Sequence, residues 1–200
     1  VREKSELEII GCADAICVSC PEERSQFESL YGSAPGTIEV VAPGVERAFF
    51  SPGDRRGARH ALGLGSGPIL LFVGRIQPLK GLDVAVQTLA QLGRKDAQLV
   101  VVGGGEITED EKKLFSDDAL LRVTHLKSAE NFELNVLFNL AKALVYPSSY
   151  EGFGIPVVEA MRAGCPVIGL NNATIREVAE KSAVLLDALS VSEFNSKFSN

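Results

Sequence analysis

From residue 68 onward, short apolar runs alternate with longer segments in which apolar residues recur at helical spacing. Six runs have the length of buried strands and are rich in β-branched residues. They cover residues 69–73, 98–102, 121–126, 144–146, 166–170 and 183–186. Continuous apolar strands that alternate with helices are typical of a parallel sheet covered on both faces. The pattern therefore predicts an α/β fold with a doubly wound, Rossmann-like parallel sheet.

The segments between these runs carry start and stop signals of helices. Helices are predicted over residues 82–92, 108–115, 129–141, 156–163 and 174–180. Thr108 with Glu111, and Thr174 with Glu177, have the spacing of a capping box, in which two side chains satisfy the first backbone amides. Pro156 suits the first turn of its helix, and a glycine at 164 suits the position just after the end.

The first third of the chain follows a looser pattern. Helices are predicted over residues 2–11 and 21–31, and strands over 14–19 and 38–42. Residues 43–66 are rich in Gly, Pro and Arg, with a small helix near 56–62, and we interpret this stretch as an inter-domain connection. The predicted division is therefore 1–45 for one domain's remnant and linker and 46–200 for the Rossmann-like domain.

Composition narrows the classes of partner. The chain has 200 residues, 46% of them hydrophobic, and 26 acidic against 20 basic side chains, which gives a net charge of −6. Non-specific nucleic-acid binding requires a basic surface, so no nucleic-acid partner is expected. An anionic ligand would have to be held by a few placed cations. No apolar run reaches the roughly 18 residues of a membrane span, and no signal peptide is recognised, which predicts a cytoplasmic protein.

Two further motifs lack the rest of their pattern. Cys17 and Cys20 have the C-x-x-C spacing of a zinc or redox site, but no second pair and no nearby histidine accompanies them. We interpret them as reduced thiols and expect no metal site. The glycines at 103–105 do not follow the G-x-G-x-x-G order of a dinucleotide fingerprint, which disfavours NAD.

The loops that follow the strands carry the candidate chemistry, because ligands of open parallel sheets bind at the carboxyl ends of the strands. The first such loop runs from Gly74 to Gly81 and contains Arg75 and Lys80. Lys80 lies near a predicted helix start, where a cation is disfavoured, and a breach of a local rule often marks function. The alternative is a solvated lysine whose stem covers apolar surface. The nearby arginine favours a bound phosphate.

The second loop, after the fourth strand of this series, is rich in Ser and Gly. Glu151 precedes its glycines, and Glu159 follows one turn into the next helix. Gly152 and Gly154 allow the backbone to bend sharply and approach a ligand, and the free amides of the helix start favour an anion. Glu159 has a second interpretation, because an acid in a first helical turn is favourable in itself. Amides for a phosphate and carboxylates for hydroxyls suit a sugar nucleotide.

These two motifs, GRIQPLKG and EGFGIPVVE with its Glu-x7-Glu spacing, resemble the family-4 retaining glycosyltransferases of GT-B fold. The resemblance covers most of the chain, and also includes ADAICVSC, VAPGV, FFSPGD and the VVGGG strand. Residues 41–92 look most like the bacterial enzymes of mycothiol synthesis that join N-acetylglucosamine to inositol phosphate. The resemblance implies the C-terminal, donor-binding half of a GT-B fold.

The resemblance also assigns roles to individual residues. Arg75 and Lys80, next to Gly74, would hold the diphosphate of the donor and act in catalysis with Glu151, which would bind hydroxyls of the donor sugar. Glu159 would bind the ribose hydroxyls. The remaining donor-binding residues would be Leu126 and Lys127 at the base, and Gly152, Phe153, Gly154 and Ile155 at the sugar and phosphate.

The implied reaction transfers a hexose or N-acetylhexosamine from a nucleoside-diphosphate sugar, expected to be UDP-linked, to an acceptor hydroxyl. The acceptor would be a small molecule, a glycan or a lipid, and no cofactor or metal is implied. Asn172 and Ala173 depart from the family pattern, because a Gly-Gly-x-x-Glu motif commonly stands there. The family's acceptor-binding N-terminal domain would be represented by its last elements alone, and the C-terminal helices would be absent.

Two alternatives remain open on the sequence. The chain could be a nucleotide-sugar-binding module without transfer activity, or a structural α/β domain whose crevice has lost its ligand. All seven asparagines lie from residue 131 onward. Sequence drift would explain this distribution, and so would a join between two related parents in an engineered or chimeric chain.

Overall fold

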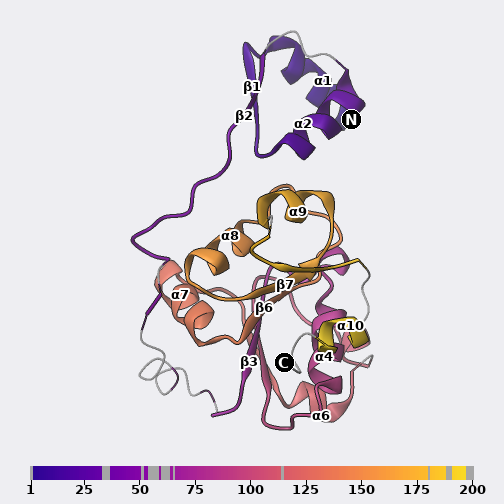
Figure 1. Ribbon diagram of the computed structural model, residues 1–200. Coiled ribbons are helices and arrows are strands. Elements are labelled where there is room, and N and C mark those ends of the chain that lie inside the picture. Colours follow the sequence, from indigo (N-terminus) through magenta and orange to yellow (C-terminus); the bar gives the residue numbers. More distant parts are fainter. Residues whose placement is uncertain are drawn as a thin grey trace.

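The computed structural model describes residues 2–32, 37–50, 52–53, 59, 64, 66–113, 115–179, 181–187 and 191–196. Two parallel sheets organise this part of the chain (Figure 1). One sheet has six strands and begins at Ile69; we call the described residues from 66 onward the sheet domain. The other has two strands and belongs to the N-terminal unit, residues 2–40 as far as they are described.

The six-stranded sheet is parallel throughout, with strand order β5-β4-β3-β6-β7-β8. Its strands are β3 (Ile69–Val73), β4 (Gln98–Val102), β5 (Val123–Leu126), β6 (Ala143–Tyr146), β7 (Val167–Leu170) and β8 (Val184–Leu186). The chain starts in the middle, winds outward through β4 and β5, then returns to the other side of β3. This order confirms the predicted doubly wound fold.

Helices cover both faces of the sheet. They are α4 (Leu82–Gln91), α5 (Glu109–Lys112), α6 (Asp117–Leu120), α7 (Asn131–Leu140), α8 (Ile155–Arg162), α9 (Ala173–Ala179) and α10 (Val191–Ser196), with a 3-10 turn η1 (Pro78–Lys80) before α4. Helices α7, α8 and α9 share one buried cluster with alternate strand residues such as Leu71 and Leu144. Helices α4 and α6 share the other cluster with Leu70 and Val145. Alternation along each strand therefore supplies two hydrophobic cores.

The N-terminal unit consists of α1 (Arg2–Cys12), β1 (Ala15–Val18), α2 (Pro21–Tyr31) and β2 (Thr37–Val40). Strands β1 and β2 pair in parallel, with Ala15 opposite Thr37. Helix α2 begins at Pro21 as predicted, but it buries none of its residues. The unit lies beside α9 of the sheet domain in Figure 1, and α2 contacts α9.

Some local predictions need correction. Thr174 does not cap α9, because the helix already begins at Ala173, and the Asn172 Oδ1 atom accepts the hydrogen bond from the Ile175 amide at 2.8 Å. Leu121 does not begin a strand, since it terminates α6 and is exposed. The short elements η1, α6 and α10 were not expected from the sequence, because none of them is long enough to display a helical period.

Two predictions lie outside the described residues. The small helix near 56–62 falls on residues of which only residue 59 is described, and the capping box of Thr108 depends on the side chain of Glu111, which is not described. Within the described helices, none is long and apolar enough to cross a membrane.

Candidate functional site

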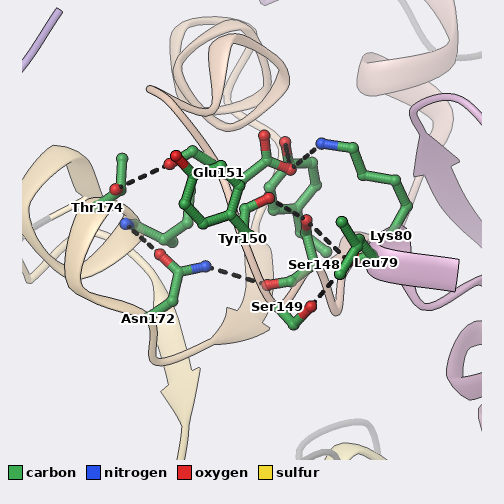
Figure 2. Close-up of polar contacts among 10 residues, drawn as sticks. Leu79, Lys80, Ser148, Ser149, Tyr150, Glu151, Asn172 and Thr174 are labelled. Carbon is green, nitrogen blue, oxygen red and sulfur yellow. Dashed lines mark hydrogen bonds and ion pairs between the residues drawn. The ribbon is translucent and has the colours of Figure 1, made fainter. Parts of the chain in front are cut away.

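The loops after β3 and β6 meet at the carboxyl edge of the sheet, where the strand order reverses. The carbonyl of Leu79 accepts a hydrogen bond from the Ser149 amide at 2.9 Å, and the hydroxyls of Ser148 and Ser149 also reach it, at 3.3 and 3.2 Å (Figure 2). Gly81 has a φ of 70°, and a Cβ there would lie 2.8 Å from the carbonyl oxygen of Pro147. The two loops are therefore packed backbone to backbone.

The segment before α9 holds the same loop from its other side. The Asn172 amide group donates to the carbonyl of Ser148 at 3.0 Å, and the Thr174 hydroxyl donates to the carbonyl of Glu151 at 3.0 Å. Figure 2 shows these side chains on the side of the loop opposite Leu79 and Lys80. The loop that carries Glu151 is therefore fixed by hydrogen bonds from two neighbouring segments.

A cavity of about 340 Å³ lies between these loops and the start of α8. It is lined by Val73, Gly74, Arg75, Lys80, Tyr146, Glu151, Phe153, Gly154, Ile155 and Pro156. Seven of the residues predicted for the site are among them. The predicted loop residues therefore come together at the carboxyl edge of the parallel sheet, as expected for this fold.

Glu151 is the polar centre of this cavity. Its Oε1 atom lies 2.7 Å from the Lys80 ammonium nitrogen and 2.6 Å from the Tyr146 hydroxyl. The Glu151 side chain is 9% exposed and the Lys80 side chain 24%. Lys80 ends η1 and is separated from α4 by Gly81. The ion pair with Glu151 offsets the unfavourable interaction of a cation with a helix start.

Tyr146 ends strand β6 and is buried. Burial raises the pKa of its phenol well above the usual range, and the negative charge of Glu151 raises it further. The phenol therefore keeps its proton and acts as a hydrogen-bond donor to the carboxylate.

Glu159 lies on α8, one turn after the cavity-lining residues, and does not itself line the cavity. Burial raises the pKa of its carboxyl to about 7, and its charge acts on the phenol of Tyr146. Among the described residues no hydrogen bond or ion pair holds this carboxylate. A half-buried acid without a protein partner suits a ligand that donates hydroxyl hydrogen bonds.

The cavity also offers positive charge to an anion. Arg75 is exposed at its rim and forms no ion pair within the described residues. Helix α8 begins after Gly154, whose φ of 87° is left-handed and whose added Cβ would lie 2.5 Å from the Ile175 side chain. The Ile155 amide at the helix start donates to no carbonyl of the described residues. A helix start and two cations therefore face one space.

Three other predicted residues lie away from this cavity. Gly152 has open space where a Cβ would be, and its carbonyl accepts a hydrogen bond from the Ser19 hydroxyl of the N-terminal unit at 3.0 Å. Leu126 ends strand β5 and Lys127 follows it, and this strand lies two strands from β3. The Lys127 ammonium group lies 2.8 Å from Glu106, and this hydrogen bond lowers the pKa of Glu106.

Sequence reasoning missed several residues that shape the site. Tyr146 was assigned to a buried strand, although an aromatic hydroxyl at the carboxyl end of a parallel strand is a signal that could have identified it. Asn172 was noted for its departure from a family pattern, yet an asparagine just before a helix is also an ordinary N-cap. Ser148 gave no distinctive signal, because serine is common in loops.

Taken together, the cavity can hold an anion at one end and hydroxyl groups at the other. Arg75, Lys80 and the Ile155 amide supply donors for phosphate oxygens, and Lys80 keeps further N–H groups beyond the one that meets Glu151. Cys17 is exposed and Cys20 buried, and both are free thiols. Within the described residues, no group of acidic, His or Cys side chains could hold a metal ion.

Comparison with known proteins agrees with this chemistry. Residues 54–198 match the family described as Glycosyl transferases group 1. Over 175 residues, the chain is 38% identical to the D-inositol 3-phosphate glycosyltransferase of Mycobacterium tuberculosis and of Mycobacterium bovis. That alignment covers 84% of this chain and 36% of the relative, so the chain spans about a third of the length of these curated relatives.

Solved structures show the same fold. Sucrose-phosphate synthase from Thermosynechococcus elongatus is 26% identical, with a TM-score of 0.78 over 99% of this chain and 51% of the synthase chain. HepE from Anabaena, solved in complex with UDP-glucose, is 20% identical, with a TM-score of 0.83 over 98% of this chain and 56% of its own. These likenesses confirm the predicted Rossmann-like half of a GT-B fold.

Proposed function

Because this chain belongs to the group 1 glycosyl transferases, we propose that its sheet domain binds the nucleoside-diphosphate sugar donor of a retaining glycosyltransferase. The proposed donor is UDP-linked and carries a hexose or an N-acetylhexosamine. The acceptor is a hydroxyl of a small molecule, a glycan or a lipid. The observation that carries the proposal is the cavity that Arg75, Lys80 and Glu151 line together with the start of α8.

The diphosphate lies at the cationic end of the cavity in this proposal. Arg75 is exposed at the rim and can form bidentate hydrogen bonds with phosphate oxygens. Lys80 contributes the N–H groups that do not bond to Glu151. The overall charge of −6 does not attract anions, so these placed groups must supply the attraction.

The sugar and the nucleoside lie on either side of the diphosphate. Glu151 accepts hydrogen bonds from hydroxyls of the donor sugar, and the backbone of Phe153 and Gly154 lines it. Glu159 accepts from the ribose, which its half-buried, unpaired carboxylate supports. The carboxyl end of β5, with Leu126 and Lys127, contacts the base.

The same arrangement would assist the chemical step. When the bond between the sugar C1 and the diphosphate oxygen breaks, negative charge grows on the departing diphosphate while positive charge grows on the sugar ring. Two fixed cations and a helix start stabilise that departing charge in the transition state. The proposal includes no metal cofactor.

The N-terminal unit is proposed to be the last part of an acceptor-binding domain, with residues 1–45 as remnant and linker and 46–200 as the donor domain. The curated relatives are named for D-inositol 3-phosphate, and this makes it the first acceptor to test. HepE, which shares the fold, binds UDP-glucose in its solved structure, so UDP sugars are the first donors to test.

A second candidate is a module that binds the nucleotide sugar without transferring it. The observation that favours it is that all residues lining the candidate donor cavity belong to the sheet domain. Donor binding without release or transfer of sugar over a panel of acceptors would distinguish this candidate from the first.

The proposal is tested by titrating the chain with UDP, GDP and ADP in a calorimeter. We expect UDP to bind, and Lys80→Ala to lose about 1.5–3 kcal/mol, since a hydrogen bond to a charged group is lost; this is about 10- to 150-fold in Kd. A chelator in the same titration should leave UDP binding unchanged.

Lys112→Ala is the matched control. Lys112 is an exposed residue of α5 paired with Glu109, so this variant removes the same charge away from the cavity. Equal affinities of wild type and Lys80→Ala for UDP, or equal losses in Lys80→Ala and Lys112→Ala, would contradict the proposal.

A further inference from the structure

Glu151 is held at its main chain and at its side chain. The Thr174 hydroxyl donates to its carbonyl at 3.0 Å, which fixes the backbone from the side of α9. From the other side, Lys80 and Tyr146 both reach the carboxylate, at 2.7 and 2.6 Å. The two side-chain contacts restrict the rotamers of Glu151 and hence the orientation of its carboxylate.

Both side-chain donors meet the same oxygen. A carboxylate oxygen has two lone pairs, so Oε1 of Glu151 is fully used by Lys80 and Tyr146. The Oε2 atom accepts no hydrogen bond from the described residues, and Glu151 lines the cavity. The unused oxygen attracts hydroxyl donors and repels phosphate oxygens, because it shares the negative charge.

The two donors differ in what else they can do. Lys80 is partly exposed and has N–H groups left for another anion, so a ligand can compete with Glu151 for it. Tyr146 is 4% exposed, ends strand β6 and has a single O–H. Burial raises the pKa of that phenol well above its usual range, so the proton stays available for Glu151. Tyr146 is therefore the fixed member of the pair.

We propose that Tyr146 is a positioning residue: it holds Oε1 of Glu151 so that Oε2 remains for a sugar hydroxyl, and it thereby sets which end of the ligand enters the cavity at Glu151. The diphosphate is then directed to Arg75 and the free N–H groups of Lys80. The inference rests on the proposed function, since it assigns the sugar end of that same donor site.

The test measures the affinity of the full chain for UDP and for two UDP sugars, UDP-glucose and UDP-N-acetylglucosamine, by calorimetry. UDP reports the nucleotide and diphosphate contacts, whereas the UDP sugars also report the contact with Glu151. We expect Tyr146→Phe to weaken binding of the UDP sugars about tenfold, while UDP affinity changes by about twofold or less. Tyr150→Phe is the matched control, because it removes a tyrosine hydroxyl next to Glu151 in sequence that lies 3.4 Å from Gln26 instead, and it should change neither affinity.

A double-mutant cycle separates positioning from packing. If Tyr146 acts through Glu151, adding Tyr146→Phe to Glu151→Ala should leave the ratio of UDP-sugar to UDP affinity unchanged. An effect of the same size in both backgrounds would overturn the inference, and so would an unchanged ratio in Tyr146→Phe alone. Wild-type protein that fails to bind UDP would instead overturn the proposed function.

Glu151→Asp leaves the buried tyrosine unaltered and keeps the inference open to refutation if Tyr146→Phe does not fold. The shorter side chain keeps the charge but withdraws the carboxylate from the Tyr146 hydroxyl. We expect the same selective loss of UDP-sugar affinity, about tenfold. Wild-type affinities for UDP and for the UDP sugars in Glu151→Asp would overturn the inference.

Discussion

The sheet domain and the N-terminal unit are both built from parallel strands and helices, yet they bury very different amounts of side chain. In the sheet domain, β3, β4 and β6 are buried along nearly their whole length, and two hydrophobic clusters fill both faces of the sheet. In the N-terminal unit, α2 buries no residue and Leu30 is 75% exposed.

The difference shows where the fold gains its stability and where the chemistry can be held rigidly. A two-stranded sheet is marginal by itself, because it lacks a face on which apolar residues can be removed from water. The loops of the sheet domain instead stand on strands fixed by two cores, so they can hold Lys80 and Glu151 at hydrogen-bonding distance. The N-terminal unit touches this machinery at its edge, through Ser19 and Gly152.

The largest expected effect comes from truncating one leucine in each unit, which tests whether the two units differ in buried apolar side chain. Leu71 is fully buried in β3, and Leu71→Ala should lower the free energy of unfolding by about 2–5 kcal/mol, because it leaves a cavity. Leu30→Ala on α2 should change it by about 0.5 kcal/mol or less. Urea denaturation measures both, and comparable losses from the two variants would show that the units share one core.

The second comparison uses two glycines of one loop. Gly154 has a φ of 87° and Ile175 in the way of a Cβ, so Gly154→Ala should cost about 1–3 kcal/mol of unfolding free energy. Gly152, on the side of the N-terminal unit, has open space for a Cβ, and Gly152→Ala should change stability by about 0.5 kcal/mol or less. Thermal unfolding distinguishes the two, and the reverse order would refute this account of the loop.

The smallest expected effect concerns Glu159. Its folded-state pKa of about 7 exceeds that of an unfolded glutamate, so the native state binds more protons and stability falls as pH rises from about 4.5 to 7. Above pH 7, Glu159→Gln should therefore be more stable than wild type by on the order of 1–2 kcal/mol, after discounting for solvent exposure. Below pH 4.5 this advantage should vanish.

Denaturation midpoints of wild type and variant at pH 4.5, 6 and 8 measure this effect. Glu28→Gln, which removes a 47% exposed carboxylate on α2 paired with Arg24, is the matched variant in the N-terminal unit. It should change stability at pH 8 by a few tenths of a kcal/mol. A difference between Glu159→Gln and wild type that does not grow between pH 4.5 and pH 7 would contradict the assignment.

Much of the architecture was predictable because local patterns of apolar and helix-terminating residues determine it. The bounds of β3 and β4 agree with the predicted runs, since strands buried on both faces are continuously apolar. Pro21 and Gly164 mark a helix start and a helix end where the sequence placed them. The capping of α9 by Asn172 was missed, because Thr174 offered an equally good pattern and its hydroxyl donates instead to Glu151.

By itself, the sequence determined the parallel sheet, the two loops that meet at its carboxyl edge, and Arg75, Lys80 and Glu151 as their polar residues. Only the tertiary structure decided how those residues pair. Lys80 and Glu151 are 71 positions apart, and no local pattern encodes an ion pair over that distance. The same holds for Tyr146 and for the raised pKa of Glu159, because burial and the direction of a donor arise from packing between elements.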